Sequence, residues 1–157
     1  MLKMATLGDD ELSAIEPSEV RVRLSLTAPA ELQTKDVKLA LKFEHHGSAD
    51  SEYQYLLKLV DVETLDALSN WFSQRAKKSR YNFKLATLSK LEFIRFQKEF
   101  VKLGKPDRYH WTVYYYLKNK IPDDEKIEID LELKLGIDED YFYLLKEAPV
   151  KINNKDN

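Results

Sequence analysis

Residues 127–135 read IEIDLELKL, and this stretch decides the fold. Its isoleucines and leucines alternate with charged residues without a break. Successive side chains of a β-strand point to opposite faces, so the pattern predicts a strand with one buried face and one solvated face. The same alternation occurs in residues 20–27 (VRVRLSLT) and 37–44 (VKLALKFE), and it returns in residues 82–87.

Three more stretches have the composition of strands. Residues 53–60 are apolar on both faces in part, which suits a strand inside a sheet. Residues 111–117 are rich in aromatic and β-branched side chains, and residues 141–145 form a final short apolar segment. Turns are expected at 29–36 and at 45–51, where Gly47 interrupts the pattern.

Helical spacing predicts helices in three places. A short helix is expected at residues 9–15, and a longer one at 63–76, where four apolar side chains recur every three or four positions. Residues 89–103 carry a broad apolar face opposite a charged one. Ser89 and Glu92 have the spacing of a capping box, which predicts that this helix begins at Ser89.

Together these elements predict a β-rich α+β domain. We expect an antiparallel β-sandwich, immunoglobulin-like, with one or two helices in its connections. A chain of 157 residues is most simply one domain, with about residues 5–150 ordered and with residues 1–4 and 153–157 flexible.

Composition excludes several kinds of chemistry. The chain has no cysteine, which excludes disulfides, thiol nucleophiles and zinc–thiolate sites within it. No apolar run approaches the ~20 residues that cross a bilayer as a helix. The net charge is −2, but residues 75–110 carry 11 basic and 3 acidic residues. This uneven distribution indicates either contact between oppositely charged parts of the fold or a site for a polyanion.

The basic segment 75–84 is one candidate partner surface. Four basic residues fall within six positions and are followed by aromatic ones, an arrangement that single-stranded nucleic acids or anionic lipid headgroups could use. The alternative is a solvated helix end, where cations complement the helix dipole. The four candidate residues are Arg75, Lys77, Lys78 and Arg80.

A tyrosine-rich stretch is the second candidate. Alternation over residues 111–117 puts Trp111 and Val113 on the core face and leaves Tyr114 and Tyr116 on the other. Tyrosine is favoured where one end of a side chain is apolar and the other is wet, as at protein interfaces. Tyr114 and Tyr116 therefore predict a partner surface.

Metal and catalytic signatures are weak. His45 and His46 are adjacent, so they point in different directions, and residues 138–140 resemble a calcium site in composition only. No sequence neighbour nominates a partner base for His110. We expect no cofactor, no metal and no enzymatic activity, and a small hydrolase is the third-ranked function.

Three segments together resemble small, uncharacterised, exported proteobacterial lipoproteins. The resemblance is carried by residues 5–12 with 20–24, by residues 81–85 with the leucines and phenylalanine that follow, and by residues 133–135 with 138–145. It implies export, a periplasm-facing sandwich domain, and a lipid anchor upstream of the chain. No lipidated cysteine is present in the sequence, which departs from the pattern.

The function expected first is therefore that of a non-enzymatic cell-envelope protein acting through protein or lipid contact. It would be periplasmic or membrane-anchored, with a cytoplasmic location as the alternative. The alternative function is a ligand-binding or nucleic-acid-binding module that uses residues 75–84.

Overall fold

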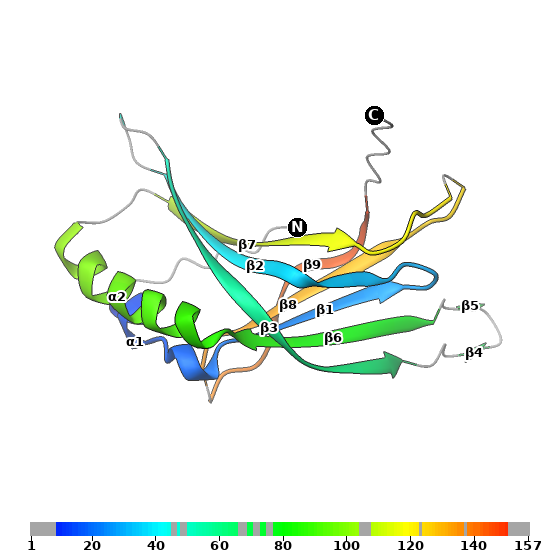
Figure 1. The fold of residues 1–157 in the computed structure, drawn as a ribbon, viewed down its shortest axis with the longest axis horizontal. Helices are drawn as coiled ribbons and strands as arrows, with labels where there is room; N and C mark the ends of the chain where they lie inside the picture. Colours follow the sequence, from blue (N-terminus) through cyan, green and yellow to red (C-terminus); the bar gives the residue numbers. More distant parts are fainter. Residues whose placement is uncertain are drawn as a thin grey trace.

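The computed structural model describes most of the chain, namely residues 9–44, 47, 50–65, 69–70, 73–74, 77–103, 108–122, 124–136 and 138–150. It contains two α-helices, one 3-10 helix and nine strands within those residues (Figure 1). In chain order they are α1 (Asp9–Ala14), η1 (Pro17–Glu19), β1 (Arg21–Thr27), β2 (Leu32–Glu44), β3 (Ser51–Leu65), β4 (Ser69–Asn70), β5 (Ser73–Gln74), β6 (Lys78–Leu85), α2 (Thr87–Leu103), β7 (Arg108–Leu117), β8 (Glu128–Lys134) and β9 (Phe142–Pro149).

Seven strands form one antiparallel sheet in the order β7-β2-β3-β6-β1-β8-β9. The long strand β3 connects its two parts, because residues 51–56 pair with β2 and residues 57–65 pair with β6. The sheet curls into a nearly closed, barrel-like shape (Figure 1). A β-rich antiparallel fold with helices in its connections is confirmed. The immunoglobulin-like sandwich is not confirmed, since the two parts are joined through β3 in a single sheet.

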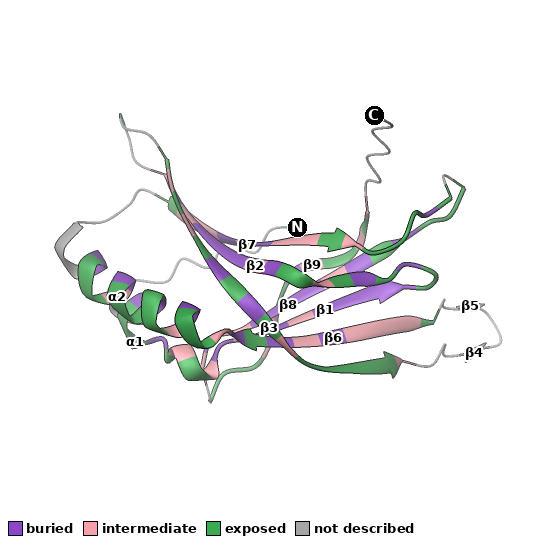
Figure 2. Ribbon diagram, viewed as in Figure 1, coloured by how far each residue is buried: buried purple, intermediate pink, exposed green. Residues whose placement is uncertain are grey.

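Period-two alternation places the core as the sequence predicted. Figure 2 shows buried residues concentrated in β1, β2 and β8, and exposed ones on the outer turns of α2. Along β8 and its flanks, Ile129, Leu131, Leu133 and Leu135 are all buried. Each such side chain contributes roughly 1.5–3 kcal/mol when it is removed from water, so these strands hold the fold together mainly through burial.

Helix α2 packs against the inner face of β2, β3 and β7 through phenylalanines. Phe93 lies between Tyr55 (ring centroids 5.1 Å apart) and Trp111 (6.4 Å). Phe96 and Phe100 both contact Phe43, at 5.6 Å. Rings at these separations stabilise the contact beyond simple area burial, and they fix α2 over this part of the sheet.

The helix predicted at 89–103 is confirmed, but its start differs. α2 begins at Thr87, and the N–H of Lys90 donates to the carbonyl of Ala86 at 3.0 Å. Ser89 is therefore inside the first turn and is not the N-cap. The short helix expected at residues 9–15 is also present, and Gln97 of α2 holds it by donating to two carbonyls, those of Leu12 (3.1 Å) and Ile15 (2.6 Å).

The helix predicted at 63–76 is wrong. Residues 63–65 continue β3, and β4 and β5 pair with each other where the helix was expected. Residues 61–65 stay extended because they pair with β6, and such cross-strand pairing overrides a local helical pattern. The turn predicted at 29–36 is likewise shorter, since β2 begins at Leu32 and absorbs an irregularity between Gln33 and Lys38.

The expected flexible ends, residues 1–4 and 153–157, lie outside the described residues. No helix that the structure describes has the length and apolar character needed to cross a membrane.

Candidate functional site

The predicted tyrosine surface lies on the outer face of β7, away from the core. Tyr114 is half-buried there, its hydroxyl donates a hydrogen bond to the carboxylate of Glu52, and the ammonium of Lys42 is 5.7 Å from its ring centroid. The hydrogen bond with Tyr114 and the nearby carboxylates of Glu52 and Asp50 raise the pKa of Lys42. Tyr114 is thus held within the fold.

The small side chain of Ala40 explains how Tyr114 on β7 can reach Glu52 on β3, across strand β2. In the register, β2 separates β7 from β3, and Ala40 lies on β2 between the level of Tyr114 and the level of Glu52. A methyl side chain there leaves room for the ring to cross β2, and Ala40 is fully buried. Tyr116 is 62% exposed, so of the two tyrosines only Tyr116 offers a largely free ring.

The predicted basic segment is only partly available. Arg75 lies outside the described residues, and Lys77 is exposed. The ammonium of Lys78 is 3.0 Å from a carboxylate oxygen of Asp130, and the guanidinium of Arg80 is 3.8 Å from Glu63. Two of the four candidate cations therefore have acidic partners, Glu63 on the adjacent strand β3 and Asp130 on β8, beyond β1.

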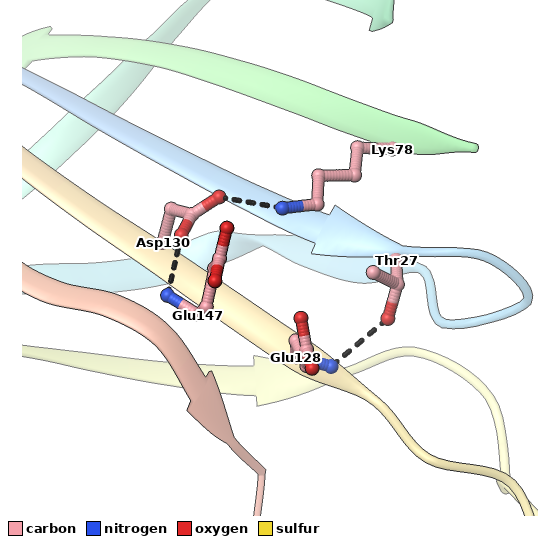
Figure 3. Close-up of polar contacts among 5 residues, drawn as sticks. All are labelled: Thr27, Lys78, Glu128, Asp130 and Glu147. Carbon is pink, nitrogen blue, oxygen red and sulfur yellow. Dashed lines mark hydrogen bonds and ion pairs between the residues drawn. The ribbon is translucent and has the colours of Figure 1, made fainter. Parts of the chain in front are cut away.

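Asp130 joins three strands through such contacts (Figure 3). One carboxylate oxygen accepts from Lys78 of β6, and the other accepts from the backbone N–H of Glu147 on β9 at 2.7 Å. Beside it, the hydroxyl of Thr27 on β1 accepts from the N–H of Glu128 at 2.9 Å. Together these contacts join β8 to β6, β9 and β1.

Two rows of residues on the outer face of β3, β6, β1 and β8 contain acidic side chains opposite or close to basic ones. We call them the paired rows; they run Asp61–Asn82–Arg23–Glu132 and Glu63–Arg80–Ser25–Asp130. The guanidinium of Arg23 is 3.3 Å from Glu132, and it lies 3.4 Å from the centre of the Tyr141 ring. The amide of Asn82 donates to Asp61 at 2.5 Å and to Glu63 at 3.2 Å.

The next row on the same face is entirely basic. Lys58 on β3 is opposite Lys84 on β6, Lys84 is opposite Arg21 on β1, and Arg21 is opposite Lys134 on β8. We call these four residues the basic row. Cβ atoms of directly opposed residues are about 5 Å apart, so four positive charges extend along roughly 15 Å of surface.

The direction of these side chains follows from their neighbours. Lys84 lies between buried Phe83 and Leu85, and Lys134 lies between buried Leu133 and Leu135. Because side chains alternate along a strand, both lysines must point away from the core. Lys58 and Arg21 alternate with core residues in the same way.

No described acidic side chain forms an ion pair with the basic row. Arg21 donates to the carbonyls of Ser18 and Val20, each at 2.9 Å, and Lys134 lies 5.9 Å from the centre of the Tyr141 ring. Neither contact cancels a positive charge. Like charges that face each other across strands destabilise a sheet, so the basic row is an electrostatic cost to the folded chain.

Exposed aliphatic side chains border one end of the basic row. Leu56 and Val60 lie on the same strand as Lys58, two residues to each side, and are 43% and 52% exposed. The N–H of Ala86 donates to the carbonyl of Leu56 at 3.0 Å, which brings the start of α2 to this place. The first two turns of α2 then present Leu88 and Leu91, which are 75% and 61% exposed.

The sequence did not reveal the basic row, because its members come from four strands that are far apart in the chain. Only Lys84 lies within the predicted segment 75–84. Each of the four appears locally as an ordinary polar position of an alternating strand. The register alone aligns them, so a search for local runs of charge could not find them.

The described residues provide no metal-binding site at the candidate histidines. His45 and His46 lie outside the described residues, and His110 is half-buried on the outer face of β7, opposite Lys42. Within the described ranges, histidine, aspartate and glutamate form no group of three that could hold a metal ion.

Comparison of the chain with protein-family models, with curated proteins and with solved structures finds no match.

Proposed function

We propose that this protein is a non-enzymatic cell-envelope protein that acts by contact, and that the basic row is its contact surface for an anionic partner. The carrying observation is the alignment of Lys58, Lys84, Arg21 and Lys134 on one solvated sheet face with no described acidic partner. Neighbouring cations on a rigid sheet favour a partner that carries several negative charges at similar spacing.

The cost of the basic row to folding supports this proposal. Every strand position in it would accept a neutral or acidic side chain, and the paired rows beside it contain such residues. Local choices that work against stability are typical of functional sites. An anionic partner would remove the repulsion on binding.

We favour the basic row over the segment 75–84, which is the alternative site for a ligand or nucleic acid. Lys78 and Arg80 would have to give up Asp130 and Glu63 before they could bind a phosphate. Lys58 and Lys84 have no such carboxylate to release among the described residues. The basic row is therefore available to a partner without a rearrangement of the sheet.

Retention on immobilised inorganic polyphosphate tests the proposal. The triple variant Lys58→Gln, Lys84→Gln and Lys134→Gln should elute at much lower salt than the parent chain, because it removes three of four adjacent cations. The matched control changes three exposed lysines outside the row, Lys35, Lys98 and Lys118, to glutamine. It has the same net charge as the row variant, and it should elute close to the parent.

If both triple variants eluted at the same reduced salt concentration, the proposal would be refuted, because retention would then depend on net charge alone. Circular dichroism should give the same strand content for all three proteins, since each substitution is on an exposed or half-exposed polar position.

A further inference from the structure

We infer that the anionic partner of the basic row is the headgroup layer of an acidic phospholipid bilayer, and that the neighbouring aliphatic side chains enter the bilayer surface. This inference rests on the proposed function, since it uses the same contact surface. It adds the chemical class of the partner and a second, apolar half of the site.

The two halves of the site are close together in the fold. Lys58 is two residues from Leu56, which shares the outer face of β3, and two from the exposed Val60, which lies at the irregularity between Leu59 and Asp61. Lys84 is four residues before Leu88, and the hydrogen bond from Ala86 to Leu56 holds the start of α2 beside β3. Peripheral proteins bind anionic membranes in this way: their cations contact the lipid phosphates, and their aliphatic side chains enter the acyl-chain boundary beneath the phosphates.

Packing within the protein does not account for the exposed leucines of α2. The inward side of this helix is already occupied by its phenylalanines, and Leu88 and Leu91 lie on its solvated side. A single exposed leucine is ordinary, whereas several beside a cluster of cations indicate an interaction surface. The long lysine stems also allow their ammonium groups to reach phosphates while the apolar groups go deeper.

The same details favour a membrane over a nucleic acid. Single-stranded nucleic acids need exposed rings on which bases can stack. Tyr141, the ring next to Lys134, is covered by the guanidinium of Arg23 at 3.4 Å. Leu56, Val60, Leu88 and Leu91 would add nothing to phosphate binding, but acyl chains would be favourable surroundings for them.

Vesicle co-sedimentation tests this inference with two lipid compositions. One vesicle is phosphatidylcholine alone, and the other contains phosphatidylcholine and phosphatidylglycerol in a ratio of about two to one. The parent chain should bind the acidic vesicles and leave the neutral ones. Each neutralised lysine should weaken binding roughly fivefold, so the triple lysine variant should lose about a hundredfold.

A second variant isolates the apolar half. Leu88→Ser with Leu91→Ser changes two exposed side chains, so folding should be retained, and binding to acidic vesicles should fall at least tenfold. Tyr116→Ser is the control, since Tyr116 is about as exposed as Leu91 but lies on β7, outside the basic row and the aliphatic side chains beside it. This control should bind as the parent does.

The outcomes separate this inference from the proposed function. Retention on polyphosphate without binding to acidic vesicles would overturn the membrane inference alone, as would tighter binding to single-stranded DNA than to vesicles. Unchanged vesicle binding by the double leucine variant would overturn the apolar half. If the parent chain bound neither polyphosphate nor acidic vesicles, the proposed function itself would be overturned.

Discussion

The paired rows and the basic row lie side by side on the same four strands, yet they treat charge in opposite ways. In the paired rows, Arg23 and Arg80 each face a carboxylate within 4 Å. In the basic row, Lys84 faces a cation on either side. The first arrangement stabilises the sheet, and the second weakens it. One sheet face thus contains a part that serves folding and a part that is left for a partner.

The difference also has a geometric side. Glu132 is only 8% exposed, and the guanidinium of Arg23 lies 3.3 Å from its carboxylate. In the basic row, by contrast, Lys58 and Lys84 are exposed and no described carboxylate forms an ion pair with them. Substitutions in the two regions should therefore change stability in opposite directions, and a buried hydroxyl in the core provides a third case for comparison.

Breaking the pair between Arg23 and Glu132 should have the largest effect. Arg23→Met leaves a nearly buried carboxylate without its partner, and we expect the free energy of unfolding to fall by about 2–3 kcal/mol. Urea denaturation measures this loss. Arg95→Met, on the exposed face of α2, is the matched control and should change stability by less than about 0.5 kcal/mol.

The double variant Arg23→Met with Glu132→Leu sharpens the same test. Replacing both members by apolar groups removes the unpaired charge, so most of the lost stability should return. A double variant as unstable as Arg23→Met would show that packing around Arg23, and not its charge, holds this part of the sheet.

Tyr55→Phe concerns a polar group without a partner in the interior, and its effect should be intermediate. The Tyr55 hydroxyl is buried and has no described hydrogen-bond partner. A buried hydroxyl in that state costs about 1–3 kcal/mol, so the variant should unfold with a free energy about 1 kcal/mol higher. Tyr116→Phe, which is solvated, should leave stability unchanged.

The pH dependence of Tyr55→Phe follows from the same burial. Burial raises the pKa of the Tyr55 hydroxyl above its ordinary value of 10.0, so the folded state keeps the proton that the unfolded state loses. The stability linked to this group is complete below pH 10 and is lost as the pH rises beyond it. The advantage of the phenylalanine variant should therefore widen above pH 10, and a constant difference there would contradict this account.

Neutralising the basic row should have the smallest effect on stability, and of the opposite sign to the loss at Arg23. Lys84→Gln removes repulsion with Lys58 and Arg21, so we expect a gain of about 0.3 kcal/mol at low salt. The gain should shrink at high salt because screening weakens the repulsion. Lys118→Gln should give no gain, and a loss of stability with Lys84→Gln would show that the row is structural.

Much of the fold could be predicted because alternation is a local signal. Residues 20–27, 37–44 and 127–135 are strands whose apolar positions are buried as expected, and the phenylalanine face of 89–103 is a helix. The failure at 63–76 has a physical reason. A spacing of three and four residues is compatible with a helix, but pairing of residues 61–65 with β6 is a tertiary contact that the local pattern does not encode.

The candidate site shows the same division. The sequence identified an excess of basic residues around 75–84 and a tyrosine patch, but it did not reveal that Asp130 and Glu63 pair with Lys78 and Arg80. By itself, the sequence determined which apolar side chains share the core face of each strand, because that depends on a repeat of two. Only the tertiary structure decided which of them are neighbours, because the register between strands joins Arg21, Lys58, Lys84 and Lys134 across more than a hundred residues of chain.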